Sequence, residues 1–169
     1  MDARPILHIV ARVLAENELE AILIGNAAAA LQGAPVTTID FDFLFRKTPR
    51  NIQKLKAVAR ALGAVILRPF YPSSGLFRMS RDDDGLQLDF MTTIDGVASF
   101  AALRAQSHAE DFGGHSLLVA NLAVVAASKR AAGRPRDKAV LDILEKAIHE
   151  AAQPKTKSKA SPRGAQGRK

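Results

Sequence analysis

The chain has 169 residues, 47% of them hydrophobic and none of them cysteine, so we expect one domain with a sizeable core and exclude disulfides and thiolate metal sites. No apolar run approaches the roughly 20 residues that span a bilayer, and no signal peptide is recognisable, so we expect a cytoplasmic protein with no membrane partner. The formal net charge of +7 comes mostly from residues 153–169, which hold six bases and no acid.

The first part of the chain predicts a helix, a strand and a second, short helix. Apolar residues recur at helical spacing over 5–19, where Pro5 suits the first turn. A short apolar strand over 20–24 then runs into Gly25, and a helix of small residues follows over 27–31. The segment 33–35 ends that helix, because glycine caps it and proline cannot continue it. Gly25 therefore lies at a strand-to-helix turn, where the backbone can approach a ligand such as phosphate.

The next segment, 38–45, predicts a strand with two different faces. Ile39, Phe41, Phe43 and Phe45 share one face because strand side chains alternate, so the carboxylates at 40 and 42 share the other. Two like charges on one strand face repel and need either solvent or a cation to relieve the repulsion. A divalent metal site and a solvated acidic face are both compatible with this pattern.

A helix with a basic outer face is expected over 48–63, with Thr48 as its N-cap and Pro49 in its first turn. That basic face is either an ordinary solvated surface or a surface that meets RNA phosphates. A strand over 64–67 and a loop over 71–75 follow.

Residues 76–81 and 86–91 predict a hairpin across the turn 82–85. Although the turn holds three successive aspartates, their spacing does not match an EF-hand loop, and Asp-Gly is a strong hairpin signal. In the second strand Leu86, Leu88 and Phe90 take the core side, which places Asp89 on the opposite face.

The last part predicts a helix over 97–105, a turn-rich segment over 110–115, a strand over 116–119 and helices over 121–132 and 135–152. Asp137 lies in the first turn of the last helix, where a carboxylate favours the helix dipole, so capping alone would explain it. Residues 153–169 have too few apolar side chains to offset the entropy of ordering and are expected to be disordered. We thus expect a domain over 1–152 and a basic tail over 153–169.

These motifs together resemble the nucleotidyltransferases of the DNA polymerase β superfamily, and within it the AbiEii-like group, which includes toxins of toxin–antitoxin systems. The resemblance covers residues 21–144 and lies in the glycine turn at 25, the short helix ending near Gly33, the Asp40-x-Asp42 strand, the later Asp89 strand and the Lys-Arg-Asp segment 126–137. It implies an α/β (α+β) fold with a mixed β-sheet flanked by helices and followed by C-terminal helices.

The resemblance also implies the chemistry. Asp40, Asp42 and Asp89 would hold Mg²⁺ and, with Lys129, form the catalytic set. The nucleotide-binding set would be Gly25, Asn26, Thr38, Lys129, Arg134 and Asp137. The protein would move a nucleoside monophosphate from a nucleoside triphosphate to an acceptor such as RNA, especially tRNA, and a cognate antitoxin would be a protein partner.

Two residues depart from the family pattern. Asn26 stands where Gly or Ser is preferred, and Val36 stands where an arginine is common, which removes a bidentate phosphate clamp. A catalytically degenerate domain that binds nucleotide, RNA or a protein partner is therefore the alternative, and a structural domain with surface acids is a third. Phosphate loops, dinucleotide-binding glycine motifs and zinc-ligand spacings are absent.

Overall fold

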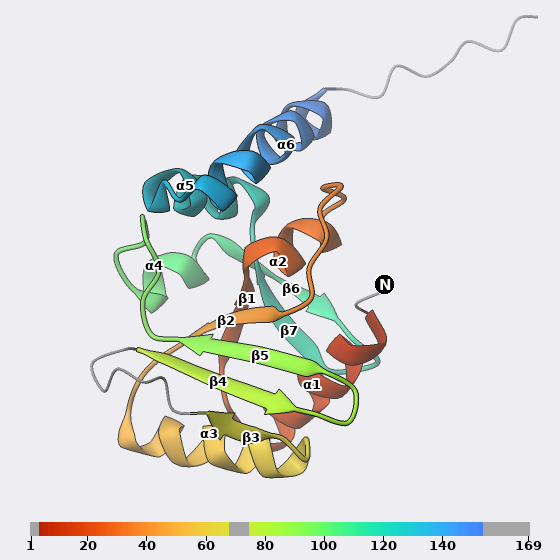
Figure 1. Ribbon diagram of the computed structural model, residues 1–169, viewed down its shortest axis with the longest axis vertical. Helices are drawn as coiled ribbons and strands as arrows, with labels where there is room; N and C mark the ends of the chain where they lie inside the picture. The colour runs from red at the N-terminus through yellow and green to blue at the C-terminus, as the bar shows by residue number, and fades with distance from the viewer. Residues whose placement is uncertain (1–3, 68–74, 154–169) are drawn as a thin grey trace, which may run out of the picture.

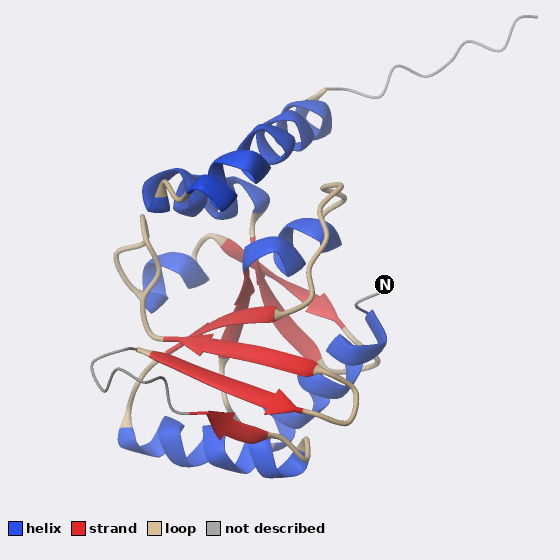
Figure 2. Ribbon diagram, viewed as in Figure 1, coloured by secondary structure: helices blue, strands red, loops and turns tan. Residues whose placement is uncertain are grey.

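The computed structural model describes residues 4–67 and 75–153, and its centre is a seven-stranded mixed sheet in the order β3-β4-β5-β2-β1-β7-β6 (Figure 1). The strands are β1 (Ala21–Ile24), β2 (Phe41–Phe45), β3 (Val65–Leu67), β4 (Leu76–Arg81), β5 (Leu86–Met91), β6 (Ser107–Asp111) and β7 (Ser116–Ala120). The helices are α1 (Arg4–Glu16), α2 (Gly25–Leu31), α3 (Pro49–Ala61), α4 (Phe100–Arg104), α5 (Leu122–Ala132) and α6 (Pro135–Ala152). The predicted fold class, a mixed sheet flanked by helices with two C-terminal helices, is confirmed (Figure 2).

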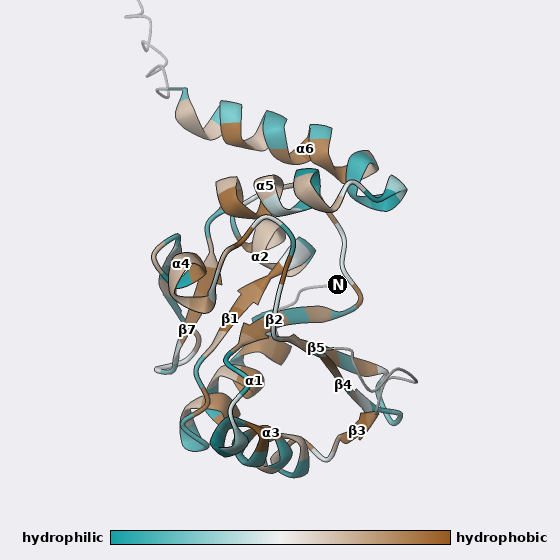
Figure 3. Ribbon diagram, turned by 90° about the vertical axis from the view of Figure 1, so that its left-hand side faces the viewer, coloured by the Kyte–Doolittle hydropathy of each residue, from teal (hydrophilic) through white to brown (hydrophobic). Residues whose placement is uncertain are grey.

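The helices are distributed on both sides of the sheet. Figures 1 and 3 place α1 and α3 together at the bottom of the molecule, and α5 and α6 at the top. Helix α2 contacts β1, β2 and α5, so it links the centre of the sheet to the upper helices. The basic outer face predicted for α3 therefore belongs to the end of the molecule opposite α5 and α6.

An aromatic cluster fills one face of the central strands. Phe43 stacks on Phe90 with ring centroids 5.0 Å apart, and Phe45 meets both Phe77 and Phe90 edge to face. Phe41, Phe43 and Phe45 are all buried, as their alternation predicts. Aromatic pairs of this kind add about 0.5–1.5 kcal/mol each beyond their buried area, so the cluster holds β2, β5 and β4 in one rigid register.

Three sequence expectations need correction. Ile39 is 91% exposed rather than buried, because β2 begins only at Phe41 and residues 39–40 form a bend before it. Ser107–Asp111 forms the edge strand β6, where the sequence predicted only a turn-rich segment over 110–115. Helix α4 begins at Phe100, since Ser99 caps it by accepting a hydrogen bond from the Ala102 N–H.

The remaining element predictions are confirmed to within a few residues at their ends. The loop expected over 71–75 and the tail expected over 153–169 lie almost entirely outside the described residues. No helix in the described part of the chain is long and apolar enough to cross a membrane.

Candidate active site

The site begins with a row of side chains that crosses three neighbouring strands. Asp42 of β2 is in register with Asp89 of β5, and Asp89 is in register with Arg78 of β4. Residues in register on adjacent strands present their side chains to the same face. The row therefore lies on the face opposite the aromatic cluster, and the rigid packing beneath fixes the spacing of its charges.

Asp40 completes the acidic cluster from the bend before β2. Thr38 donates its hydroxyl proton to the Asp40 backbone carbonyl and also lies 3.3 Å from Oδ1 of that side chain. On the other side Gln87 Nε2 donates to Asp40 Oδ2 at 3.4 Å. These contacts hold the Asp40 carboxylate over the sheet although the residue itself lies outside the strand.

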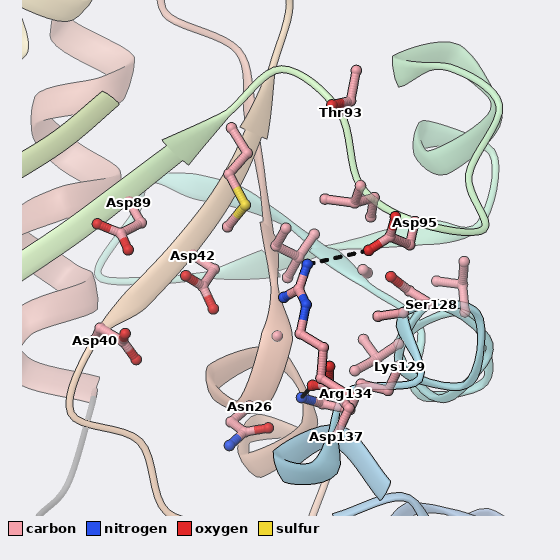
Figure 4. A pocket seen from close by; sticks show the side chains of 18 of the residues that line it. Asn26, Asp40, Asp42, Asp89, Thr93, Asp95, Ser128, Lys129, Arg134 and Asp137 are labelled. Carbon is pink, nitrogen blue, oxygen red and sulfur yellow. Dashed lines mark hydrogen bonds and ion pairs between the residues drawn. The ribbon is translucent and has the colours of Figure 1, made fainter. Parts of the chain in front are cut away.

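One carboxylate oxygen from each of Asp40, Asp42 and Asp89 lies within 4.8 Å of the other two (Figure 4). Burial, together with the charges of Asp40 and Asp89, raises the pKa of Asp42 to about 6, against the opposing effect of Lys129 and Arg136. The raised pKa reflects first the burial of the carboxylate and then the repulsion among the three acids. Three convergent carboxylate oxygens fit a hard divalent cation.

Gly25 closes the floor of the site beside these acids. It adopts φ of +69°, and a Cβ at this position would stand 2.5 Å from Oδ2 of Asp42. A side chain here would force the carboxylate to move. The positive φ and the lack of room for a Cβ both favour glycine at this position. The neighbouring Asn26 donates from Nδ2 to the Thr37 carbonyl at 3.3 Å, and its Oδ1 is buried with no partner among the described residues.

The opposite wall comes from the corner between α5 and α6. Lys129 of α5 lies 3.4 Å from Oδ1 of Asp137 in the first turn of α6, and both side chains are largely buried. The other Asp137 oxygen, Oδ2, is buried without a partner in the described part of the chain. Lys129 lines the same pocket as Asp42, and its charge acts to lower the pKa of Asp42.

Arg134 reaches across the mouth of the site. It starts at the glycine-containing corner between α5 and α6, where Gly133 has φ of +62°, and its Nη2 lies 3.3 Å from Oδ2 of Asp95 (Figure 4). Both side chains are about half exposed. Gly96, next to Asp95, packs so closely on α5 that a Cβ would stand 2.9 Å from Ala131.

These walls enclose one pocket of about 670 Å³, a volume typical of a small-ligand site. All predicted site residues line it except Thr38, which instead supports Asp40. Apolar side chains from β5, the segment after it and the two C-terminal helices complete the lining, including Met91, Ile94, Val124 and Val140. The pocket thus offers carboxylates at one side, cations at the other and an apolar surface between them.

Three charged residues of this pocket were not predicted from the sequence: Arg78, Asp95 and Arg136. A signal existed for Arg78, because counting outward from the predicted turn 82–85 pairs residue 78 with residue 89. Asp95 and Arg136 carried no such signal, since their positions depend on how the loop after β5 meets α5 and α6.

The same architecture occurs in solved structures of other proteins. The chain matches no protein-family model and no curated protein. It is similar to TM1012 of Thermotoga maritima, assigned as a nucleotidyltransferase, with a TM-score of 0.57, 18% identity and coverage of 86% of this chain and 92% of that one. It is also similar to the antibiotic-resistance factor ANT(2'')-Ia, with a TM-score of 0.62, 16% identity and coverage of 90% and 86%.

The lincosamide antibiotic adenylyltransferase LnuA, in a lincomycin-bound crystal structure, gives a TM-score of 0.58 at 12% identity, with coverage of 82% of this chain and 94% of that one. The similarity spans most of each chain, whereas the identity is too low to carry more than the architecture. The protein has the nucleotidyltransferase fold.

Proposed function

We propose that the protein is a Mg²⁺-dependent nucleotidyltransferase that moves a nucleoside monophosphate from a nucleoside triphosphate to an acceptor hydroxyl. The observation that carries this proposal is the convergence of Asp40, Asp42 and Asp89 within 4.8 Å, in a pocket whose far wall presents Lys129. Carboxylates that hold cations at one side and an ammonium at the other suit the two ends of a triphosphate.

In the reaction the acceptor oxygen bonds to the α-phosphorus, and the bond from that phosphorus to the bridging oxygen of pyrophosphate breaks. Asp40 and Asp42 would hold Mg²⁺, which when bound neutralises phosphate charge and polarises the α-phosphorus. The proton of the acceptor hydroxyl passes to a carboxylate of the cluster. Lys129, held by Asp137, neutralises charge on the leaving pyrophosphate, and Gly25 leaves room for the Asp42 carboxylate.

Two acceptor classes follow from the similarities. RNA, especially the acceptor end of tRNA, is the acceptor that the AbiEii-like resemblance implies, and the protein would then be a toxin with a cognate antitoxin. A small molecule such as an antibiotic is the acceptor that the fold similarity to the antibiotic-resistance factor ANT(2'')-Ia and the lincosamide antibiotic adenylyltransferase LnuA suggests.

A binding domain without turnover is the competing function, and the bidentate ion pair between Arg78 and Asp89 favours it. Arg78 Nε and Nη2 donate to the two Asp89 oxygens at 2.8 and 2.7 Å. In that state a cation that approaches Asp89 meets the positive charge of the Arg78 guanidinium, and each Asp89 oxygen keeps only part of its acceptor capacity. A binding domain would keep this ion pair, whereas an enzyme that uses Asp89 as a metal ligand would work against it.

The test is transfer of label from each α-labelled nucleoside triphosphate, with Mg²⁺, to total tRNA and separately to an aminoglycoside and a lincosamide. The native chain is compared with Asp40→Asn/Asp42→Asn and with the exposed-turn control Asp82→Asn. Label that appears with the native chain and the control but not with the double variant supports the transferase and identifies its acceptor. Mg²⁺-dependent nucleotide binding without label on any acceptor would favour the binding domain.

A further inference from the structure

The ion pair between Arg78 and Asp89 is built into the sheet. The two residues are directly opposed on β4 and β5, and the guanidinium meets the carboxylate with two parallel hydrogen bonds. Asp89 is 4% exposed, so few other donors can reach it. Such a bidentate pair is among the strongest polar contacts in proteins.

Arg78 also stands in the same row across the sheet as Asp89 and Asp42. Its pKa is raised by the hydrogen bond to Asp89 and by the charges of Asp89, Asp40 and Asp42. The guanidinium therefore neutralises part of the charge of the three carboxylates, and the remaining negative charge attracts a cation.

The geometry separates the three carboxylates into two kinds. Asp40 and Asp42 have no ion pair among the described residues, and the donors that contact the Asp40 oxygens, Thr38 and Gln87, are neutral and do not repel a cation. Each Asp89 oxygen already accepts a hydrogen bond from Arg78, so a cation that binds Asp89 is limited to the remaining lone pairs and is repelled by the adjacent guanidinium. The Arg78 side chain is 42% exposed, so it has room to swing into the pocket when it is displaced.

We propose that Arg78 and a divalent cation compete for Asp89, so that the protein binds one cation at Asp40 and Asp42 and a second only after Arg78 leaves Asp89. This inference rests on the proposed function, because it assumes that the pocket holds divalent cations. Arg78 is a positioning residue in this scheme: seated, it keeps the site in a one-cation state, and displaced, it frees the third carboxylate.

The first experiment measures Mn²⁺ binding by electron paramagnetic resonance and by calorimetry for the native chain and for Arg78→Gln. In the native chain we expect one ion, followed by a second that binds at least about tenfold more weakly than the second ion of the variant. Arg81→Gln is the matched control, because Arg81 lies on the same strand and also makes a bidentate pair, with Asp84, away from the cluster. Identical isotherms for the native chain and Arg78→Gln would overturn the inference.

The second experiment uses the native chain alone and therefore does not depend on whether a variant folds. The Arg78 Nε–H resonance is followed by nuclear magnetic resonance in the native chain during a Mg²⁺ titration. We expect it to stay at its ion-paired position while the first ion binds and to shift as the second ion binds. A resonance that does not change when both ions are bound, or that moves with the first ion, contradicts the competition.

Different results would overturn the proposed function and the competition between Arg78 and a cation. If neither the native chain nor any variant binds Mn²⁺ or Mg²⁺, the cation site and with it the proposed function are rejected. If cations bind but the second affinity is independent of Arg78, only the competition is rejected, and Mg²⁺-dependent transfer remains open to the labelling assay.

Discussion

The backbone of Gly25 lies directly against the carboxylate of Asp42, so that a Cβ on Gly25 would stand 2.5 Å from Oδ2 of Asp42. The contact couples the turn after β1 to the acidic strand β2. Because real Cβ atoms do not approach an oxygen this closely, a side chain at residue 25 forces the Asp42 carboxylate or the turn itself to move.

We therefore expect Gly25→Ala to abolish cation binding and transfer, while it lowers the stability of the fold only modestly. The strain of an alanine at φ of +69° should cost about 1 kcal/mol of folding free energy. Gly63→Ala is the matched control, since Gly63 has φ of +65° with nothing within 4 Å of the added Cβ. Calorimetric Mn²⁺ binding and urea unfolding of both variants measure the two effects, and equal Mn²⁺ affinity in the two would refute the role given to Gly25.

The raised pKa of Asp42 predicts that this residue weakens the metal-free fold at neutral pH. Its ordinary value is 3.8 and its folded value is about 6, so the folded state binds the proton more tightly than the unfolded state. The resulting stability is fully present below about pH 4 and is lost as the pH rises through about 6. One pKa unit corresponds to about 1.4 kcal/mol, so the loss is at most about 3 kcal/mol.

Asp42→Asn removes this titration, so in EDTA the variant should be more stable than the native chain at pH 8 and gain little at pH 4. Asp84→Asn is a control of opposite sign, because the hydrogen bond from Arg81 lowers the pKa of Asp84 and stabilises its charged form. Urea unfolding at both pH values measures the difference. A stability advantage of Asp42→Asn that does not change with pH would contradict the proposed cause.

The alternation of residues along the strands was enough to predict which face carries Asp42 and Asp89. It could not predict that β2 and β5 lie side by side in parallel, because that pairing joins strands separated by a helix and two other strands. The same alternation gave a wrong prediction for Ile39. This residue fits the apolar pattern, but it lies in the bend before β2 and is exposed. The edge strand β6 was not predicted, because its polar sequence lacks the alternation of apolar and polar residues, as is common at sheet edges.

The largely buried pair of Lys129 and Asp137 predicts non-additive effects of substitution. Lys129→Met leaves the Asp137 carboxylate buried without its cation and should cost about 1–3 kcal/mol of folding free energy. Adding Asp137→Asn to that variant should recover part of the loss, because the uncompensated charge is removed. Transfer should stay absent in both, since the ammonium that lines the pocket is missing.

A double-mutant cycle by urea unfolding, with the labelling assay alongside, tests this pair. The exposed pair of Arg130 and Glu145 on the same two helices supplies the control cycle and should show a coupling of at most about 1 kcal/mol. Purely additive losses at Lys129 and Asp137 would show that the two residues do not act as a pair.

The ion pair between Arg134 and Asp95 predicts that the two partners have opposite effects on nucleotide binding. Both side chains are about half exposed, so breaking the pair should hardly change stability. Arg134→Gln should weaken binding of a nucleoside triphosphate, because it removes a cation from the pocket mouth, whereas Asp95→Asn should leave it unchanged or tighten it by freeing Arg134 and removing a repelling charge. Titration of each variant with a non-hydrolysable triphosphate, with Mg²⁺ and at two salt concentrations, measures the affinities. Equal weakening in both variants would instead mean that the pair acts as a structural contact between the loop after β5 and the corner of α5 and α6.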